Sequence, residues 1–334
     1  MTAVNAILAA SIGPVRKIFY TEGAAVLAVI AFATLVVLVL VALGAAFFSL
    51  ACRRPFRPLF RRCAPLALIP AVAFSYGMFL ERNRFVVRPV DVTCETLPEA
   101  FDGYRIAHIS DIHAASFRHR KGALRRAVKK TNALQADLIA VTGDLITLSP
   151  QELEPLQEIL AGLTARDGVF SILGNHDYGT YMRAGREAEK RAAAEVVERQ
   201  AQMGWRLLCN RHEIIRRGAD SIAVAGVDNI TPGLLFPSTG DLEAALRGLG
   251  PCWTVLLSHD PAHWDAEVSD KGIQLMLSGH THAFQFSLLG WSPSRYLFRQ
   301  YRGLYRRGES HLYVNPGLGE TLFPPASASA PKSP

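Results

Sequence analysis

The chain has 334 residues, a formal net charge of +7 and a hydrophobic content of 49%, enough for one large domain or two of ordinary size. Much of the positive charge lies beside apolar N-terminal segments, which indicates membrane-flanking charge and gives no reason to expect nucleic acid as a partner. The five cysteines include no Cys-x-x-Cys pair, which argues against a zinc finger, although Cys94 could pair with Cys209 or Cys252 in an oxidising compartment.

The N-terminal region is predicted to contain a tail, residues 1–22, and a membrane region, residues 23–80. Residues 23–52 carry no charge. An uncharged apolar stretch longer than about 18 residues is typical of a membrane span and is too long for the core of a signal peptide. We therefore expect a transmembrane helix over about 23–52.

A second apolar stretch follows an arginine-rich loop. Residues 53–62 contain five arginines, and residues 63–80 are uncharged but include Pro65 and Pro70. Membrane helices tolerate proline better than soluble helices do. We therefore expect a second, kinked span over about 63–80, in preference to a re-entrant or surface segment.

The side of the membrane depends on that second span. With two spans, the arginine loop is the natural cytoplasmic element, and the large C-terminal domain then lies outside the cytoplasm. With one span, the same arginines would hold the domain inside. Basic residues before the first span and after the second match the loop in number, but the loop is denser, so an extracytoplasmic domain is expected.

The rest of the chain is predicted to form a linker (81–103), a domain (104–323) and a disordered tail (324–334) rich in proline, alanine and serine. Residues 85–87 and 90–93 resemble short strands. The domain alternates apolar runs with amphipathic segments, which indicates an α/β fold with a mixed sheet core. The expected strands are 104–109, 138–141, 169–173, 206–209, 213–216, 222–227, 254–258, 273–277 and 311–314, and the expected helices are 121–134, 151–163, 182–203, 241–249 and 261–268.

Five polar clusters each follow an apolar run of this domain. In the first, one residue separates Asp111 from His113, so both side chains point to one side if the chain stays extended. Sites in α/β sheets are built at the carboxyl ends of strands, and the glycines beside these clusters permit tight turns. The other clusters are Gly143-Asp144, Gly174-Asn175-His176-Asp177, Ser258-His259-Asp260 and Gly279-His280-Thr281-His282.

The donors of these clusters form a nitrogen and oxygen set without thiolate. Such a set suits two divalent transition ions such as Mn, Fe or Zn, and argues against a structural cysteine zinc site. A bridging Asp144 would give each ion four protein ligands, and two ions roughly 3.5–4 Å apart can activate a water and hold phosphoryl oxygens. The predicted metal ligands are Asp111, His113, Asp144, Asn175, His259, His280 and His282.

The motifs Asp-x-His, Gly-Asp, Gly-Asn-His-Asp, a single His and Gly-His-Thr-His, in this order over about residues 104–317, resemble those of the calcineurin-like metallophosphoesterases. The resemblance implies a four-layer fold, with two mixed β-sheets packed as a sandwich and flanked by helices, here preceded by transmembrane helices. It implies that His176 protonates the leaving oxygen or stabilises the developing charge, and that Asp177 orients His176. It also distributes the ligands: Asp111, His113, Asp144 and His282 for one ion, and Asp144, Asn175, His259 and His280 for the other.

More narrowly, residues 258–265 and Asn315-Pro316-Gly317 resemble a bacterial branch of this family with N-terminal membrane helices, which implies the bacterial inner membrane as the location. Two departures stand out. Ala283 follows the Gly-His-Thr-His motif where this branch usually has glycine, so it adds a methyl group near the metals. The chain also runs into its tail where the branch usually has a further strand.

Two segments allow more than one interpretation. The charged helix 182–203 is most simply a solvated face, but it could cover the site, with Tyr178 and Tyr181 near the entrance. The stretch 291–305 mixes aromatic side chains with arginines. A packed loop is slightly favoured there over a surface that holds an anionic lipid headgroup.

The expected function is a membrane-anchored, metal-dependent phosphoesterase that hydrolyses a phosphate ester by direct attack of a hydroxide bridging the two metal ions. One alternative is hydrolysis of a lipid-linked phosphate or pyrophosphate, such as a phospholipid or a lipid A precursor. A second alternative is a non-catalytic metal-binding membrane module. The expected partners are the substrate, the two metal ions and the membrane, without nucleic acid.

Overall fold

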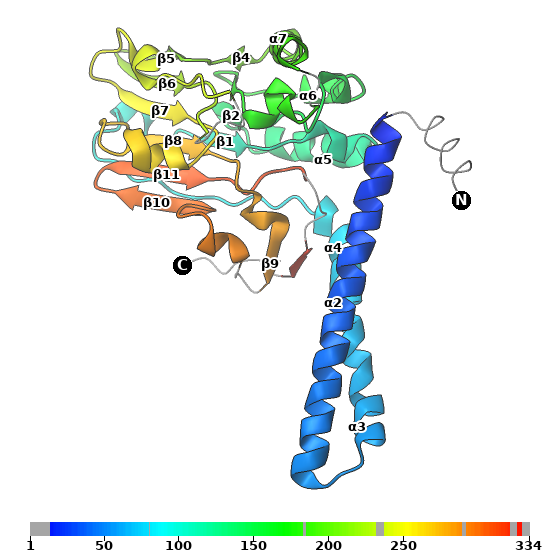
Figure 1. Ribbon diagram of the computed structural model, residues 1–334. Coiled ribbons are helices and arrows are strands. Elements are labelled where there is room, and N and C mark those ends of the chain that lie inside the picture. The colour runs from blue at the N-terminus through cyan, green and yellow to red at the C-terminus, as the bar shows by residue number, and fades with distance from the viewer. Residues whose placement is uncertain are drawn as a thin grey trace. The chain divides into compact units, whose positions relative to one another are not determined.

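The computed structural model describes residues 14–79, 81–182, 185–231, 237–288, 292–320 and 326–328. Contacts between residues divide the chain into two compact units (Figure 1). The first unit contains Met1–Arg84, Phe286–Trp291 and Leu322–Pro334, and the second contains Phe85–Gln285 and Ser292–Thr321.

A long helix, α2 (Pro14–Cys52), dominates the first unit. Among the helices whose residues are described, one stretch is long and apolar enough to cross a membrane, Leu27–Cys52 with 26 residues and a mean hydropathy of 3.0. At a rise of 1.5 Å per residue it extends about 39 Å, more than the roughly 30 Å of a bilayer's hydrocarbon core. The first predicted span therefore has a helix of sufficient length.

The predicted second span is divided between two shorter helices, the 3₁₀-helix η1 (Ala64–Leu68) and α4 (Ile69–Phe79). Before them, α3 (Phe56–Cys63) covers most of the arginine-rich loop, and all three helices contact α2. None of them alone reaches the length of a bilayer core. The second span, and with it the side of the membrane, stays a prediction.

The C-terminal part of this unit includes one short parallel pair, in which β12 (Ala326–Ala328) lies beside β9 (Phe286–Leu288). β12 falls within the segment predicted to be disordered, residues 324–334. The remaining residues of that segment, like residues 1–13 of the predicted N-terminal tail, lie outside the described residues.

Two β-sheets, one parallel and one mixed, form the second unit (Figure 1). One has four strands in the order β1-β2-β3-β4, all parallel. The other has six strands in the order β10-β11-β8-β7-β6-β5, with antiparallel pairs at both edges. The strands are β1 (Ile106–Ile109), β2 (Leu138–Thr142), β3 (Val169–Ile172), β4 (Arg206–Leu207), β5 (Arg211–Arg217), β6 (Asp220–Gly226), β7 (Trp253–Leu257), β8 (Leu275–Ser278), β10 (Gly303–Arg307) and β11 (Ser310–Val314).

Side chains that point alternately to the two faces of the strands form three apolar layers. In β2, Leu138 and Ala140 join a core shared with β6, β7 and β8, whereas Ile139 and Val141 face the core beside α5. Successive side chains of a strand point to opposite faces, so a strand buried on both faces reads as one continuous apolar run. The outer face of the six-stranded sheet packs on α8 and Trp264. These layers confirm the predicted sandwich of two sheets flanked by helices.

The helical elements follow most of the predicted positions. The predicted helix 151–163 is wrong, because only η5 and α6 form there and Pro155, which has no amide hydrogen to donate, lies between them. The helices of this unit are η3 (Glu99–Phe101), η4 (Ala114–Phe117), α5 (Lys121–Asn132), η5 (Pro150–Glu152), α6 (Gln157–Leu160), η6 (Asn175–Tyr178), η7 (Thr180–Met182), α7 (Arg186–Gln202), α8 (Leu242–Leu246), the π-helix η8 (Trp264–Val268), η9 (His282–Gln285) and η10 (Pro293–Tyr296).

The segment predicted as a linker packs with the second unit instead of forming strands. Residues 85–87 and 90–93 contain no strand, which corrects the prediction. Phe85 packs on the core beside Phe117, and Phe101 is fully buried between the two sheets. Aromatic burial therefore holds this segment in place.

Candidate metal centre

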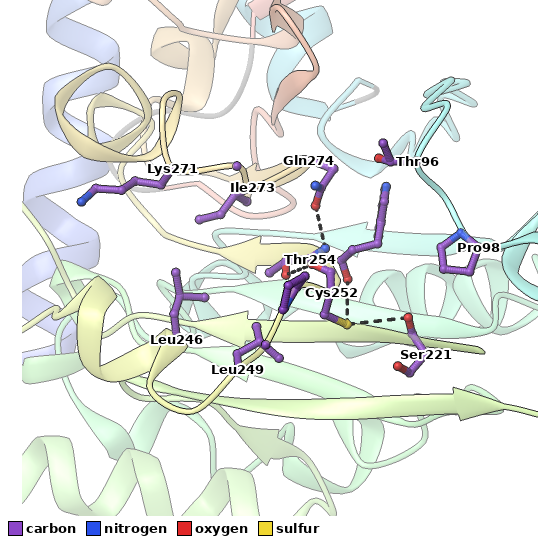
Figure 2. A pocket seen from close by; sticks show the side chains of 14 residues that line it. Thr96, Pro98, Ser221, Leu246, Leu249, Cys252, Thr254, Lys271, Ile273 and Gln274 are labelled. Atoms are coloured by element: carbon purple, nitrogen blue, oxygen red, sulfur yellow. Dashed lines mark hydrogen bonds between the residues drawn. The ribbon is translucent and has the colours of Figure 1, made fainter. Parts of the chain in front are cut away.

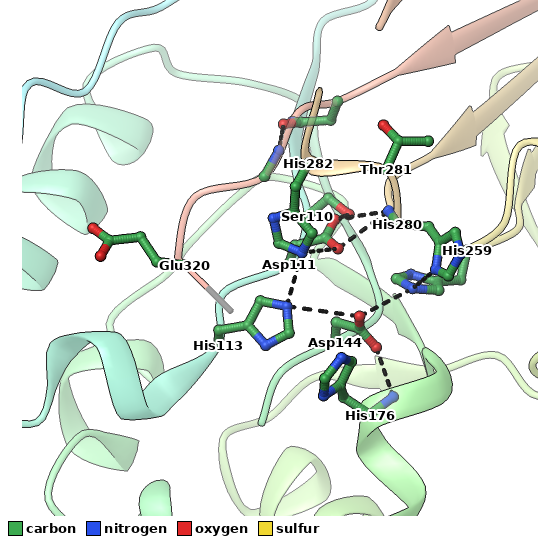
Figure 3. Close-up of polar contacts among 12 residues, drawn as sticks. Ser110, Asp111, His113, Asp144, His176, His259, His280, Thr281, His282 and Glu320 are labelled. Atoms are coloured by element: carbon green, nitrogen blue, oxygen red, sulfur yellow. Dashed lines mark hydrogen bonds and ion pairs between the residues drawn. The ribbon is translucent and has the colours of Figure 1, made fainter. Parts of the chain in front are cut away.

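The predicted site residues lie on loops that start at the carboxyl ends of parallel strands (Figure 3). β1, β2 and β3 supply residues from one sheet, and β7 and β8 supply residues from the other. Asp111 N donates to Gly143 O over 3.0 Å, which joins the loops after β1 and β2. The Nδ1 of His259 lies 2.7 Å from Thr142 O, so the two sheets are also joined at this point.

Asp144 occupies the centre of the site. Its Oδ2 lies 3.7 Å from the Nε2 of His113 and 3.2 Å from the Nε2 of His259. Its Oδ1 accepts a hydrogen bond of 2.9 Å from the backbone N of His176. The carboxylate therefore faces two imidazole rings from different sheets, which is the arrangement that a bridging ligand requires.

Two groups of donors meet at this carboxylate. In the first, one ligand atom from each of four buried residues lies within 4.8 Å of the others: Asp111, His113, Asp144 and His282. The Nε2 atoms of His113 and His282 are 3.0 Å apart, and His282 Nε2 lies 3.2 Å from Asp111 Oδ1. Such a cluster of nitrogen and oxygen atoms can hold a metal ion.

The second group contains Asp144, His259 and His280, again within 4.8 Å of one another. Asn175 adds its side-chain oxygen, which lies 2.9 Å from His280 Nδ1. The same nitrogen lies 3.3 Å from His259 Nε2. The fold thus brings together all seven residues predicted as ligands, four in one group and four in the other, with Asp144 in both.

Backbone strain is concentrated at these residues. Nine described residues other than glycine have a positive φ, and five of them are predicted ligands. Residues with a Cβ rarely adopt a positive φ, and residues with a strained backbone cluster at functional sites. The five are Asp111 (+50°), His113 (+44°), Asp144 (+53°), His280 (+72°) and His282 (+50°).

Two glycines pack directly against the carboxylates. A side-chain carbon on Gly174 would overlap the carboxylate of Asp144, and one on Gly279 would overlap the carboxylate of Asp111 and the hydroxyl of Ser110. The glycines of the sequence motifs therefore allow neighbouring loops to approach the ligands closely.

The pKa shifts of His113 and His280 suit metal binding, whereas that of His259 opposes it. Burial, followed by the charge of His282, lowers the pKa of His113 well below its usual value, and burial lowers the pKa of His280 as well. Burial alone would raise the pKa of Asp144, but His259 holds it well below the usual range. Burial would lower the pKa of His259, yet the Asp144 carboxylate raises it to about 10. A cation bound between Asp144 and His259 would compete with that proton.

The two predicted catalytic residues have different surroundings. The Nδ1 of His176 lies 2.7 Å from Thr147 O, so Nδ1–H donates to this carbonyl and leaves Nε2 as the second ring nitrogen. The carboxylate of Asp177 accepts from the backbone N of Leu145 (2.8 Å), Ile146 (3.1 Å) and Gly174 (2.9 Å). Asp177 therefore fixes the loop that carries Asp144, and Thr147, not Asp177, orients the ring of His176.

Tyr181 of η7 lies against His176 and Asn175, closer to the site than the predicted position near an entrance implies. Its ring stacks on His176, with centroids 4.2 Å apart and an interplanar angle of 18°. Its hydroxyl lies 3.5 Å from the Nδ2 of Asn175, and the residue is 42% exposed. Tyr178, in contrast, donates its hydroxyl hydrogen to Asp228 and does not reach these ligands in the described contacts.

Other polar residues near the motifs have structural roles. Asp260 Oδ1 accepts a hydrogen bond from Ala262 N over 2.9 Å. His263 is buried between the Ser258 hydroxyl (3.0 Å) and the Glu267 carboxylate (3.1 Å). The five cysteines are free thiols.

A separate cavity of about 650 Å³ opens at the opposite ends of β7 and β8 (Figure 2). Among its lining residues are Cys252 and Thr254 at the start of β7, and Lys271 and Gln274 just before β8. Lys271 is the one charged residue in this lining. The cavity lies at the amino ends of the strands and is distinct from the cluster of predicted ligands.

Comparisons with known proteins agree with this geometry. A family model described as calcineurin-like phosphoesterase matches residues 104–284. A zebrafish (Danio rerio) relative named transmembrane protein with metallophosphoesterase domain is 33% identical over 283 residues, which are 81% of this chain and 61% of the relative. The uncharacterized metallophosphoesterase YkuE of Bacillus subtilis is 29% identical over 282 residues, 81% of this chain and 92% of the relative.

The chain thus spans about three fifths of the zebrafish protein. Among solved structures, a dimetal phosphatase from Danio rerio has a TM-score of 0.40 and 12% identity, over 67% of this chain and 90% of that one. The family model covers more than half of the chain and includes each of the five motifs. The chain therefore belongs to the calcineurin-like phosphoesterase family.

Proposed function

We propose that the chain is a membrane-anchored phosphoesterase that depends on two divalent metal ions. The observation that carries this proposal is the position of Asp144, whose Oδ2 lies within 3.7 Å of His113 Nε2 and 3.2 Å of His259 Nε2. One carboxylate oxygen between imidazoles from two sheets can serve both ions. Buried carboxylates, imidazoles and an amide oxygen fit Mn, Fe or Zn, and His259 would lose its proton when a metal ion binds.

The residues divide between two binding groups. Asp111, His113 and His282 would hold one ion, His259, His280 and Asn175 the other, and Asp144 both. When bound, such ions lower the pKa of a water molecule and stabilise the negative charge of phosphoryl oxygens. The reaction is then a direct displacement, in which a water oxygen forms the new bond to phosphorus and the ester oxygen leaves with the bonding electrons.

His176 would complete this displacement. Its Nδ1–H donates to Thr147 O, so in the imidazolium form Nε2–H would give a proton to the departing ester oxygen or donate a hydrogen bond to the phosphoryl group. Tyr181 stacks on this ring and keeps it from rotating. Asp177 acts through the backbone, because it holds the loop that presents Asp144.

The membrane anchor is supported by the first unit. Leu27–Cys52 is long enough to span, and its apolar side chains are largely uncovered, with Leu50 82% exposed and Phe32 68% exposed. Relatives from zebrafish and cattle (Bos taurus) are named transmembrane proteins. An anchor of this kind favours, as a second candidate, a lipid-linked phosphate ester as the substrate, with the domain outside the cytoplasm if residues 63–80 also span.

The proposal is tested on the full chain, purified in detergent and loaded with Mn²⁺. We expect hydrolysis of bis-p-nitrophenyl phosphate, on the order of a thousandfold slower in Asp144→Asn and His280→Ala and unchanged in Lys271→Ala. Full activity of the first two variants, with their metal content retained, would contradict the proposal. Release of phosphate from a phospholipid in mixed micelles would identify the second candidate, and protease accessibility in intact cells compared with inverted vesicles would identify the side.

A further inference from the structure

Residues 292–302, here called the rim segment, follow the loop that carries His280 and His282. Two hydrogen bonds hold the segment to this loop: Ser292 Oγ donates to Ala283 O over 2.8 Å, and Thr281 Oγ1 donates to Tyr301 O over 2.6 Å. The ring of Phe298 meets the His280 ring edge-on, with centroids 6.4 Å apart. The rim segment is therefore fixed beside the metal centre.

In the rim segment, small polar side chains are buried and large apolar ones are exposed, the reverse of the usual pattern. Its serines face inward, with Ser292 and Ser294 fully buried. Its large side chains face outward instead, with Tyr296 73% exposed and Leu297 69% exposed. Single exposed apolar residues are common on soluble domains, whereas here two adjacent bulky side chains are exposed together beside the metal centre and form a small apolar surface.

Positive charge surrounds these two side chains. The guanidinium of Arg295 lies 5.7 Å from the centre of the Tyr296 ring, and the side chain of Arg299 is 81% exposed. Arg299 pairs with Asp265 at 3.2 Å, but Asp265 already pairs with Arg307 at 2.6 Å. Arg306 pairs with Glu309, so the four side chains of Arg295, Arg299, Arg306 and Arg307 face the two carboxylates of Asp265 and Glu309, and among the described ion pairs this surface keeps an excess of positive charge.

We propose that the rim segment is a membrane-docking surface, in which Tyr296 and Leu297 enter the headgroup region and Arg295 and Arg299 bind anionic lipid phosphates. Tyrosine and arginine present an apolar body with a polar end and are suited to this boundary. An anionic leaflet attracts each nearby basic residue. The inference rests on the membrane anchor of the proposed function and extends it, because docking would hold the metal centre at the lipid phosphates.

A bilayer accounts for these observations better than a nucleic acid or a protein partner does. Phosphates of any kind would pair with the arginines, and the exposed Tyr296 ring would accept a base, but the exposed Leu297 beside it loses water only against an apolar phase such as a bilayer. The same chain carries an apolar helix of 26 residues, so a bilayer is the partner that its own anchor provides. A bilayer that holds the anchor of the same chain is available to the second unit without diffusion of a separate partner.

The test uses the full chain with Leu297→Trp, reconstituted into vesicles of phosphatidylcholine alone or with 30% phosphatidylglycerol, each containing bromine-labelled acyl chains that quench tryptophan. The matched control is Ile214→Trp, since Ile214 is also exposed (42%) and lies on β5, at the other edge of the sheet from β10. We expect quenching of the added tryptophan at position 297, stronger with phosphatidylglycerol and weakened by 1 M NaCl. At position 214 we expect none.

Charge removal sharpens the test. Arg295→Gln with Arg299→Gln should lower the docked-to-undocked ratio roughly fivefold for each arginine, whereas Arg211→Gln with Arg216→Gln on β5 should leave it unchanged. Equal quenching at positions 297 and 214, equal quenching with and without anionic lipid, or quenching relieved by the oligonucleotide dT20 would each overturn the inference.

The readout does not depend on catalysis. A chain that hydrolyses bis-p-nitrophenyl phosphate but is not quenched at position 297 contradicts only the docking surface. A chain that docks but hydrolyses no phosphate ester contradicts only the proposed activity.

Discussion

The two ends of β7 and β8 contrast sharply. At the carboxyl ends lie His259, His280 and His282, in a cluster with buried carboxylates and a strained backbone. At the amino ends lies the cavity of about 650 Å³, with Lys271 as the one charged residue in its lining. The same strands therefore carry reactive side chains at one end and an ordinary hollow at the other.

The difference shows what identifies a functional site in this fold. A hollow whose lining is neutral apart from Lys271 costs little folding free energy, because its polar groups remain hydrated. Burying ionisable groups costs several kcal/mol for each group unless partners compensate. Asp111, His113 and Asp144 are all essentially inaccessible to solvent, so their cluster needs an explanation that the cavity does not. A cation bound among them would supply the compensation.

Metal removal should have the largest effect and acts at only one of the two ends. After chelation with dipicolinate, we expect activity on bis-p-nitrophenyl phosphate to fall by at least about a thousandfold. The melting temperature should fall too, because a ligand present at 100 times its Kd contributes about 2.7 kcal/mol. Added Mn²⁺ should restore both. A Gln274→Ala variant at the cavity should respond to chelation as the unaltered chain does; unchanged activity without metal would break the comparison.

His176 tests the chemistry apart from metal binding. His176→Asn keeps an N–H group that can reach Thr147 O, but it removes the imidazole Nε2. We expect kcat to fall by about 10²–10⁴-fold, the usual contribution of a positioned proton donor, while elemental analysis finds the metal content unchanged. A parallel loss of metal would instead assign His176 to metal binding.

A matched pair of glycines compares the two ends by stability. In Gly279→Ala, the new carbon would overlap Ser110 and Asp111, so we expect a loss of about 1–3 kcal/mol in unfolding free energy and weaker metal binding. In Gly250→Ala, at the cavity, the new carbon meets nothing within 4 Å, and stability should change by less than about 0.5 kcal/mol. Chemical denaturation measures both; equal losses would remove the distinction between the ends.

The sequence predicts which residues gather at this edge because the motifs are local. Each ligand follows an apolar run, and parallel strands of one sheet end at one edge, so the order of the motifs is enough to expect convergence. Pro155 was a visible signal that should have divided the predicted helix 151–163. The strand β10, Gly-Leu-Tyr-Arg-Arg, lacks the alternation of apolar and polar residues that would predict a strand. It forms by antiparallel pairing with β11.

Contacts between distant loops could not be predicted in this way. Asp177 is next to His176 in the chain, yet its carboxylate points to the backbone of the loop after β2. Tyr181 reaches His176 only because Gly179, with φ of +67°, turns the chain between them. Side-chain direction of this kind depends on tertiary packing, which a motif does not encode.

Tyr181 should have a moderate effect. Tyr181→Phe keeps the ring that stacks on His176 but removes the hydroxyl near Asn175, so we expect activity to fall by about tenfold or less, with an unchanged melting temperature. Tyr181→Ala removes the stack as well and should reduce kcat further. If both variants match the unaltered chain in kcat and KM, Tyr181 has no role in catalysis or substrate binding.

Ala283 should have the smallest effect, because opposing terms nearly cancel. Its φ of +46° costs a residue with a Cβ roughly 1–2 kcal/mol, which Ala283→Gly would relieve. The same change destabilises the protein in two ways. Glycine gives the unfolded chain more conformational entropy, which costs about 0.5–1 kcal/mol, and the loss of a buried methyl group costs about 0.8 kcal/mol. We expect the unfolding free energy to change by less than about 1 kcal/mol and the metal content to stay constant. A loss above about 2 kcal/mol would mean that this methyl group is needed for packing beside His282, and a gain of that size would mean that the strain at Ala283 outweighs its burial.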